Sequence, residues 1–258
     1  MKKSFLIPLI LVFLISAAVS QDNPKVPTAK VTQLDKNLYE ISMQTCNILA
    51  SIGLDGVLLV DANYKECGKY MTAEIEKLGG VNINYIINTH WHFDHTGGNQ
   101  VIGNKNTIII AHKDAKELLL KDQFLLGDTI NALPEYALPK ITFDKSYDLD
   151  FNGEKIELIA LSGGHSAGDI IVYFKKSNIL HIGDIIFSDM FPFADYDHGG
   201  SVFTLEKNIQ KIIDMFPDDV KIIPGHGRIC TKDDLKKYRE MVIATSEIVK
   251  EEKDKGKS

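Results

Sequence analysis

The chain has 258 residues, of which 44% are hydrophobic and 25% are charged, and its formal net charge at pH 7 is −6. This is an ordinary globular composition, and no Pro-, Gly- or Ser-rich stretch divides the sequence into separate domains. Basic residues do not form a run interleaved with aromatic ones, which argues against nucleic acid as a partner.

The first twenty residues (1–20) are typical of a secretory signal peptide. Two lysines precede the apolar run 5–15, and residues 18–20 (AVS) place small side chains at the two positions that a signal peptidase reads. An uncleaved anchor is the alternative, but a membrane span needs roughly 20 apolar residues. We therefore expect cleavage before Gln21, a periplasmic or secreted protein without membrane attachment after cleavage, and one domain over 21–258. Without the two lysines, 27 basic residues face 35 acidic ones.

The first half of the mature chain begins with short strands and continues with alternating helices and strands. Apolar residues at helical spacing predict a helix over 65–78 that ends at Gly79-Gly80. The other predicted elements are short strands over 30–60 with a turn at 53–56, strands at 83–88 (INYIIN) and 107–111 (TIIIA), and a helix near 113–120.

The second half starts again with strands. YDLDF and KIELIAL flank Asn152-Gly153, which is a strong hairpin signal, and DIIVYF and NILHIGD flank residues 175–177. The elements expected after them are a long loop at 187–203, a helix near 204–216, the strand VKIIPG, a helix that begins at Thr231 with Asp234 in a variant of the capping box, and a frayed tail over 250–258. Strands followed by helices, twice, predict a layered α/β sandwich with two similar halves.

Four of the predicted strands end in a side chain that can bind a metal. They are YIINTH at His90, ELIALSGGH at His165, ILHIGD at Asp184 and VKIIPGH at His226. Glycines next to these ends allow the backbone to turn sharply. If the strands are neighbours, their ends converge on one edge of the sandwich.

One segment is crowded with such side chains, because His90, His92, Asp94 and His95 lie within six residues. A single histidine at a strand end is explained by hydrogen bonds to the backbone, but that explanation does not account for this density. One zinc takes about four ligands, so the seven candidates suit two metals that share a bridging carboxylate and a bridging water.

The motif HWHFDH at 90–95, followed by His165, Asp184 and His226, resembles the metallo-β-lactamase superfamily. LxVD near 58–61, GD at 183–184 and PGHG at 224–227 extend the resemblance over nearly the whole mature chain. It implies an α/β fold of the four-layer αββα type. It also implies the ligands of two metals: His90, His92 and His165 for the first, Asp94, His95 and His226 for the second, and Asp184 between them.

The resemblance further implies a zinc-dependent metallohydrolase. Two Zn²⁺ ions would lower the pKa of a shared water, and the resulting hydroxide would attack an acyl carbonyl. Asp94 would orient the nucleophile and carry a proton to the leaving group. We expect an exported enzyme that cleaves a β-lactam, lactone or thioester bond in a small molecule. Iron or manganese could replace zinc, and the sequence leaves the oligomeric state open.

Two departures count against the common cysteine-containing β-lactamases. Asp184 stands where those enzymes have a cysteine ligand, and Phe187 stands where they have a substrate-binding lysine. Only 32 residues follow His226, too few for the helical domain of glyoxalase II. An iron-binding redox or sulfur-metabolism member of the superfamily is the main alternative, and a binding module without activity is a third.

Ser166 lies in GHSAG, which matches the G-x-S-x-G nucleophile elbow of serine hydrolases, and Asp184 and His226 follow in triad order. An elbow needs a helix after the serine, whereas DIIVYF is typical of a strand. We therefore expect Ser166 to stabilise a turn.

The remaining candidates have more ordinary roles. His112 and His181 are expected to be structural, Trp91 and Phe93 to pack the motif into the core, and loop 187–203 to cover the pocket. The three cysteines do not have the CxxC spacing of a zinc knuckle, and a Cys46–Cys67 disulfide is compatible with export but is not established by spacing.

Overall fold

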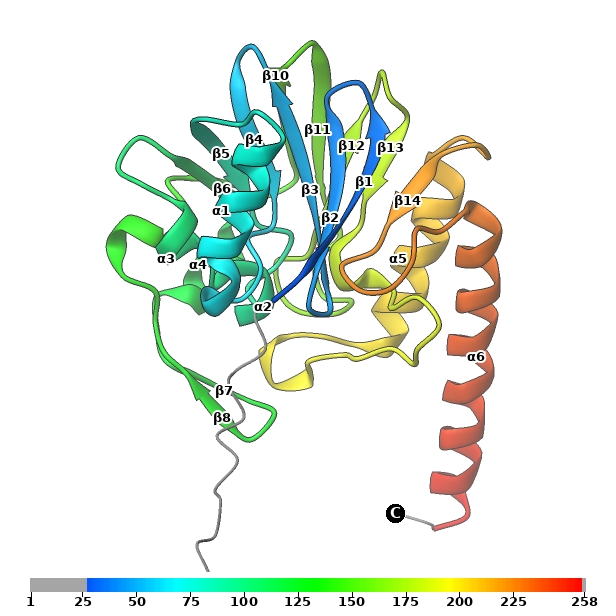
Figure 1. Ribbon diagram of the computed structural model, residues 1–258. Coiled ribbons are helices and arrows are strands. Elements are labelled where there is room, and N and C mark those ends of the chain that lie inside the picture. The colour runs from blue at the N-terminus through cyan, green and yellow to red at the C-terminus, as the bar shows by residue number, and fades with distance from the viewer. Residues whose placement is uncertain (1–26, 257–258) are drawn as a thin grey trace, which may run out of the picture.

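A computed structural model describes residues 27–256, so the expected signal peptide (1–20) lies outside the described residues. Two large β-sheets pack face to face, with helices on both outer sides (Figure 1). The first sheet has the strand order β1 (Ala29–Asp35), β2 (Leu38–Met43), β3 (Cys46–Gly53), β4 (Gly56–Val60), β5 (Ile83–Ile87), β6 (Ile108–His112) and β9 (Ile141–Phe143). The second has the order β10 (Ser146–Phe151), β11 (Glu154–Ala160), β12 (Ile170–Phe174), β13 (Ile179–His181) and β14 (Lys221–Ile223).

The direction of the strands brings the predicted site residues to one edge. β4, β5, β6 and β9 run parallel in the first sheet. In the second sheet β11 and β13 are both antiparallel to β12, and β14 is parallel to β13, so β11, β13 and β14 all run the same way. The four ligand-bearing strands are thus not all neighbours, because β5 belongs to the other sheet and β12 separates β11 from β13.

The space between the sheets is filled by alternate residues of their strands. Leu58 and Val60 of β4 face the second sheet, whereas Val57 and Leu59 face the helices. In β12, Val172 faces the first sheet and Ile171 faces the helices of its own side. This alternation follows from the two-residue period of a strand, and it gives both faces of each sheet an apolar surface.

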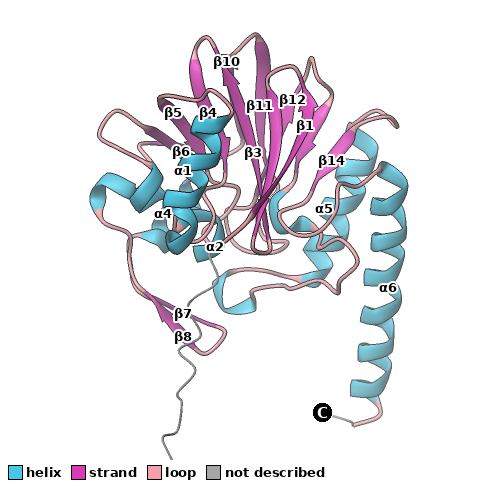
Figure 2. Ribbon diagram, viewed as in Figure 1, coloured by secondary structure: helices cyan, strands magenta, loops and turns pink. Residues whose placement is uncertain are grey.

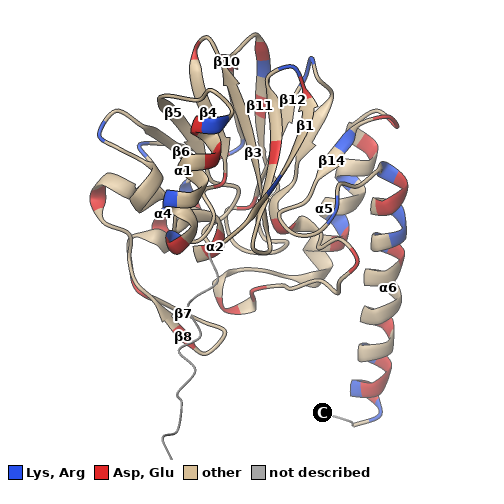
Figure 3. Ribbon diagram, in the orientation of Figure 1, with Lys and Arg blue, Asp and Glu red and all other residues tan. Residues whose placement is uncertain are grey.

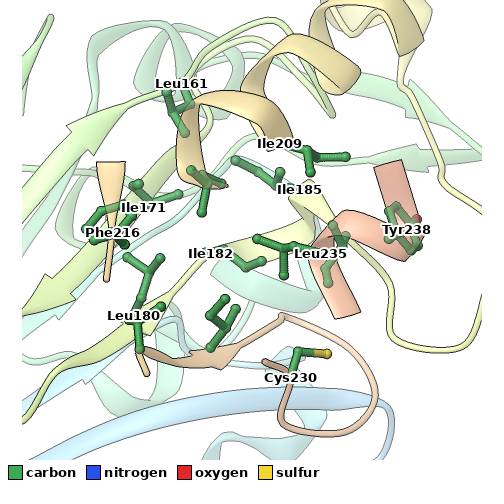
Figure 4. Packing of buried hydrophobic residues seen from close by; sticks show 14 of the residues in the cluster. Leu161, Ile171, Leu180, Ile182, Ile185, Ile209, Phe216, Cys230, Leu235 and Tyr238 are labelled. Carbon is green, nitrogen blue, oxygen red and sulfur yellow. The ribbon is translucent and has the colours of Figure 1, made fainter. Parts of the chain in front are cut away.

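Helices cover the two outer faces, which completes the four-layer αββα arrangement expected from the sequence (Figure 2). Met71 and Ile75 of α1 and Ile102 of α3 pack on the first sheet. Figure 4 shows the other side, where Ile209 of α5 and Leu235 of α6 pack against the second sheet. The α-helices are α1 (Gly68–Lys77), α2 (Phe93–Thr96), α3 (Asn99–Ile102), α4 (Lys113–Leu119), α5 (Val202–Met215) and α6 (Lys232–Asp254). Short 3₁₀ helices are η1 (Lys65–Cys67), η2 (Glu135–Ala137), η3 (Gly183–Ile185) and η4 (Tyr196–His198).

The structure differs from the sequence-based prediction in two places. The tail expected to fray from residue 250 is helical as far as Asp254, because α6 continues for 23 residues. A hairpin of β7 (Gln123–Leu125) and β8 (Asp128–Ile130) was not predicted. Its turn, Leu126-Gly127, has two positive φ angles (53° and 94°), as a type I′ hairpin turn requires. The predicted capping box is confirmed, since Thr231 and Asp234 exchange both hydrogen bonds at the start of α6.

Charged residues are mixed over the surface. Figure 3 shows acidic and basic residues alternating along α6 and scattered over the ends of the strands. Among the described residues, no helix combines the length and apolar character needed to cross a membrane.

Candidate metal centre

The first part of the site follows β5 and is fixed by close backbone contacts. α2 carries Asp94 and His95, and Thr96 donates a side-chain hydrogen bond to the Trp91 carbonyl at 3.1 Å. At Gly98 a Cβ would lie 1.9 Å from the Ala62 carbonyl oxygen, so only glycine lets this segment pack against the end of β4. The TGG sequence after the motif therefore places the four metal-competent side chains against the sheet edge.

The second part comes from three loops of the second sheet. His165 lies in a turn after β11, held by the Asp169 carboxylate, which accepts hydrogen bonds from the backbone amides of His165 and Ser166 at 2.9 Å. Asp184 follows β13 and His226 follows β14. At the Gly225 position between them, a Cβ would lie 2.1 Å from Asp184 Oδ1.

The structure brings the seven predicted side chains together in two groups. The first donor group has one ligand-competent atom from each of four buried residues, all within 4.8 Å of one another: His90, His92, His165 and Asp184. Nε2 of His165 lies 2.9 Å from Nδ1 of His92 and 3.6 Å from Asp184 Oδ2. Nε2 of His90 is buried without a hydrogen-bond partner among the described residues, although it lies 3.8 Å from Asp184 Oδ2.

The second donor group lies on the other side of Asp184. It consists of Cys46, Asp94, His95 and His226, again within 4.8 Å of one another. Nε2 of His226 lies 3.2 Å from Nε2 of His95, 3.2 Å from Asp94 Oδ2 and 3.3 Å from Asp184 Oδ2. The Asp184 carboxylate therefore contacts imidazoles of both groups, as a bridging ligand must.

Each of the five imidazoles has its other ring nitrogen held by an oxygen outside the two groups. The pairs are His90 Nδ1 with Thr89 Oγ1 (3.0 Å), His92 Nε2 with Asp195 Oδ2 (2.9 Å), His165 Nδ1 with the Phe193 carbonyl (2.8 Å), His95 Nδ1 with Asp61 Oδ2 (2.8 Å) and His226 Nδ1 with the Thr45 carbonyl (2.8 Å). Histidines that bind metals are held in this way, with one nitrogen fixed by a neighbour and the other directed at the ion.

Burial and charge set the protonation states of the site. Burial, with the neighbouring His95, holds the pKa of His90 well below its ordinary value, and burial with His92 lowers the pKa of His165 to about 4. These imidazoles are neutral, which is the form that binds a metal. Burial alone would raise the pKa of Asp184, but the charge on His95 outweighs it, so that this carboxylate is ionised.

The second group attracts positive charge. Burial opposes protonation of His95 and His226, but the carboxylates of Asp184 and Asp94 raise the pKa of His95 well above its ordinary value and that of His226 to about 9. A divalent cation among these donors would supply the same positive charge. The donor types, the orphaned His90 nitrogen and this charge balance all fit a pair of metal ions.

Sequence reasoning missed three residues that shape the site: Asp61, Asp195 and Cys46. Asp61 accepts hydrogen bonds from His95 and from the amide and hydroxyl of Thr89, in a left-handed conformation with φ of 68°. A non-glycine residue held there points to a functional constraint. LxVD contains Asp61, but nothing in the sequence pairs it with His95, and Asp195 and Cys46 carry no motif.

His112, His181 and Ser166 have structural roles, as expected. His112 caps α4 by accepting from the Asp114 amide, and His181 accepts from the Gly183 amide. Ser166 donates its hydroxyl to Asp169 at 2.7 Å, and the strand β12 follows it, so the turn is not a nucleophile elbow. His198 contacts Asp195 at 2.8 Å.

A cavity of about 270 Å³ opens onto both donor groups. Besides His92, Asp94, Asp184 and His226, its lining consists of Tyr64, Phe93, Leu125, Leu126, Phe187 and Phe193. No Lys or Arg belongs to this lining in the described part of the chain. Trp91 is buried as expected, but Phe93 is only partly buried because it lines the cavity. Within loop 187–203, Phe187 and Phe193 cover the site, whereas Met190 and Phe191 line a neighbouring hollow and are exposed.

Comparisons with known proteins show the family to which this chain is related. Residues 46–228 match the family described as the metallo-beta-lactamase superfamily. The chain is 30% identical over 185 residues to "Probable metallo-hydrolase MJ0888" of Methanocaldococcus jannaschii, a match that covers 67% of this chain and 83% of that protein. It is 25% identical to "Metallo-beta-lactamase IND-1" of Chryseobacterium indologenes, covering 70% of this chain and 72% of that protein. It spans only about half the length, 55% and 53%, of two "Beta-lactamase-like protein 2 homolog" relatives, from Drosophila melanogaster and Caenorhabditis elegans.

The fold has close structural relatives. The crystal structure of the DIM-1 metallo-beta-lactamase superposes with a TM-score of 0.68 at 21% identity, covering 86% of this chain and 100% of that one. That identity supports the fold alone. Together with the family match over residues 46–228, the two donor groups lead to one conclusion: this chain belongs to the metallo-beta-lactamase superfamily.

Proposed function

We propose that this chain is an exported dinuclear zinc hydrolase that cleaves an acyl bond in a small molecule. The observation that carries the proposal is the position of Asp184 between two donor groups that open on one cavity. One ion would be held by His90, His92 and His165. The other would be held by Asp94, His95 and His226, and Asp184 would bind both ions. When bound, such a pair lowers the pKa of a water and polarises a carbonyl.

Asp94 is the residue best placed to move a proton. Its side chain is 14% exposed, more than that of any other predicted ligand, and it lines the cavity. Burial alone would raise the pKa of Asp94, but His95 and the hydrogen bond from His226 outweigh burial and lower it. The ionised carboxylate can therefore orient a nucleophile and then carry a proton to the leaving group.

The cavity lining favours a neutral, apolar substrate. Phe93, Leu125, Leu126, Phe187 and Phe193 provide apolar contact, and the described lining contains no Lys or Arg to pair with a carboxylate. A lactone or thioester with an apolar acyl chain fits this surface better than a β-lactam, which carries a carboxylate. The scattered basic residues in Figure 3 are likewise consistent with a small substrate in place of nucleic acid.

The test is a substrate panel with a metal analysis. Protein purified without added metal is expected to contain about two zinc ions per chain. It should hydrolyse an apolar lactone or thioester faster than nitrocefin. Hydrolysis unchanged by a chelator, or fully retained by His92→Ala, would contradict the dinuclear mechanism. Iron as the native metal would favour the redox alternative. His112→Ala, which alters a buried histidine outside both donor groups, is the matched control.

Export rests on the sequence of residues 1–20 and has its own test. Expression of the full chain, followed by fractionation and N-terminal sequencing, should give a periplasmic or secreted protein that begins at Gln21. A protein that retains Met1 in the cytoplasm would contradict this part of the proposal.

A further inference from the structure

We propose that the sulfur of Cys46 is an additional donor to the metal held by the second donor group. This inference rests on the proposed function, because it presumes that Asp94, His95 and His226 hold an ion. It adds a soft ligand to a site that sequence reasoning described with histidine and aspartate alone.

The position of the sulfur carries the proposal. Sγ of Cys46 lies 3.6 Å from Asp94 Oδ2 and within 4.8 Å of the donor atoms of His95 and His226. Cys46 is fully buried at the first residue of β3. The thiol donates a hydrogen bond to Asp94, so it points at the donors that would surround an ion.

The backbone ties Cys46 to His226. The two residues form an isolated β-bridge, and His226 donates from Nδ1 to the carbonyl of Thr45 at 2.8 Å. The Asn47 amide donates to the Gly225 carbonyl at 2.8 Å, and its side chain donates to the carbonyls of Pro224 and Gly227. The start of β3 and the PGHG loop are thus one unit, which holds the sulfur and the imidazole at a fixed separation.

The other cysteines show what a packing role looks like in this protein. Cys67 belongs to the hydrophobic cluster under α1. Cys230 belongs to the cluster between the second sheet and α6 (Figure 4). Its sulfur also contacts Ser188 Oγ at 3.3 Å. Cys46 belongs to none of the hydrophobic clusters formed by the described residues. All three thiols are free, so the disulfide between Cys46 and Cys67 is not formed and the sulfur remains available.

Binding would replace the thiol proton by the metal. The S–H bond breaks, the proton leaves to solvent, and a sulfur–metal bond forms with no change of oxidation state. The sulfur, two imidazoles and the carboxylates of Asp94 and Asp184 would then make a donor set of S, N, N, O and O. Such a set favours zinc or cobalt over magnesium or manganese, which prefer oxygen ligands.

The test uses cobalt as a spectroscopic probe. Metal-free protein titrated with Co²⁺ should bind two equivalents and develop a thiolate-to-cobalt charge-transfer band in the near ultraviolet. Cys46→Ser should lack the band and bind the second equivalent at least about 10-fold more weakly. Cys67→Ser and Cys230→Ser are the matched controls and should keep the band.

Several outcomes would overturn the inference. Two bound equivalents without the band in the unaltered protein, or a band that persists in Cys46→Ser, would exclude sulfur ligation while leaving the dinuclear proposal intact. Failure to bind cobalt at all would overturn both. If Cys46→Ser does not fold by circular dichroism, the ¹¹³Cd resonance of the unaltered protein decides, because a sulfur ligand shifts it strongly downfield.

Discussion

The carboxylate of Asp195 lies 2.9 Å from Nε2 of His92 and fixes the orientation of that imidazole. Asp195 is buried, and it also contacts His198 Nδ1 at 2.8 Å. Burial alone would raise the pKa of Asp195, but the hydrogen bonds from His92 and His198 lower it, so the carboxylate accepts from both rings. With Nε2 of His92 held in this way, its Nδ1 faces the first donor group.

Replacing Asp195 with Ala should therefore weaken metal binding at the first donor group by about 10- to 100-fold, because His92 loses the partner that orients it. Isothermal titration of metal-free protein with zinc measures the change. Asp197→Ala alters an exposed neighbour in η4 and is the matched control. Equal affinity in Asp195→Ala and Asp197→Ala would show that the Asp195 contact does not orient a ligand.

The backbone at Gly225 lies so close to the site that it leaves no room for a side chain. In Gly225→Ala the new Cβ would lie 2.1 Å from Asp184 Oδ1 and 2.8 Å from His95 Cε1, so the Asp184 carboxylate must move. A displacement of about 1 Å at reacting groups can lower activity about 100-fold. We expect that loss in hydrolysis of the best substrate, together with reduced metal content measured by plasma mass spectrometry.

The control for Gly225→Ala is Gly153→Ala, at a surface turn with φ of 77° and no atom within 4 Å of the new Cβ. The strain of an alanine in this left-handed backbone conformation should lower the free energy of unfolding by about 1 kcal/mol and leave the metal content unchanged. Full activity in Gly225→Ala would contradict the bridging position of Asp184.

The sequence predicts the parts of this site that are local. His90, His92, Asp94 and His95 can be recognised as candidate ligands because they lie within six residues. His226 can be recognised because Gly225 and Gly227 flank it. Cys46 is not visible, since in the apolar run of β3 it resembles a core residue. Its role depends on a contact across 180 residues with the His226 loop, and spacing along the chain cannot report such a contact.

The fold, like the site, could be predicted only where a clear pattern is present in the sequence. The order of strands followed by helices, twice, predicts the layered sheets, and the capping-box pattern at Thr231 and Asp234 predicts the start of α6. The β7–β8 hairpin escaped prediction because strands of three residues show no periodicity. Its Leu125 and Leu126 nevertheless line the cavity, so this part of the cavity wall could not be predicted from the sequence.

Asp234 should stabilise the start of α6 in a pH-dependent way. Its hydrogen bonds with Arg228 and with the Thr231 amide lower the pKa of its carboxyl below the ordinary value of 3.8. Because the folded-state pKa is depressed, the contribution is fully present above the unfolded value and is lost as the pH falls through the folded one. Asp234→Ala should lower the free energy of unfolding by about 1 kcal/mol between pH 4 and 7, with a shrinking difference below pH 4.

Urea unfolding at several pH values measures this difference. Asp233→Ala is the matched control, because Asp233 is exposed and pairs with Lys236 on the surface. It should change stability by less than about 0.5 kcal/mol. Equal losses in both variants would show that the capping box contributes nothing specific.

The side chain at position 187 should determine whether the cavity prefers a neutral or an anionic substrate. Its ring stacks on His226 with centroids 5.2 Å apart and an interplanar angle of 8°, so a longer side chain at this position reaches the mouth of the site. Phe187→Lys places an ammonium group in a lining that contains neither Lys nor Arg among the described residues. A hydrogen bond to a charged group contributes about 1.5–3 kcal/mol, which corresponds to about 10-fold or more in kcat/KM.

Phe187→Lys should therefore raise kcat/KM for a carboxylate-bearing β-lactam relative to an apolar lactone by about 10-fold or more. Phe187→Leu removes the ring without adding charge and should leave that ratio near its original value. The ratio separates selectivity from general damage, because a loss of metal or of folding lowers both rates together. An unchanged ratio in Phe187→Lys would mean that the substrate approaches the metals from a side that Phe187 does not reach.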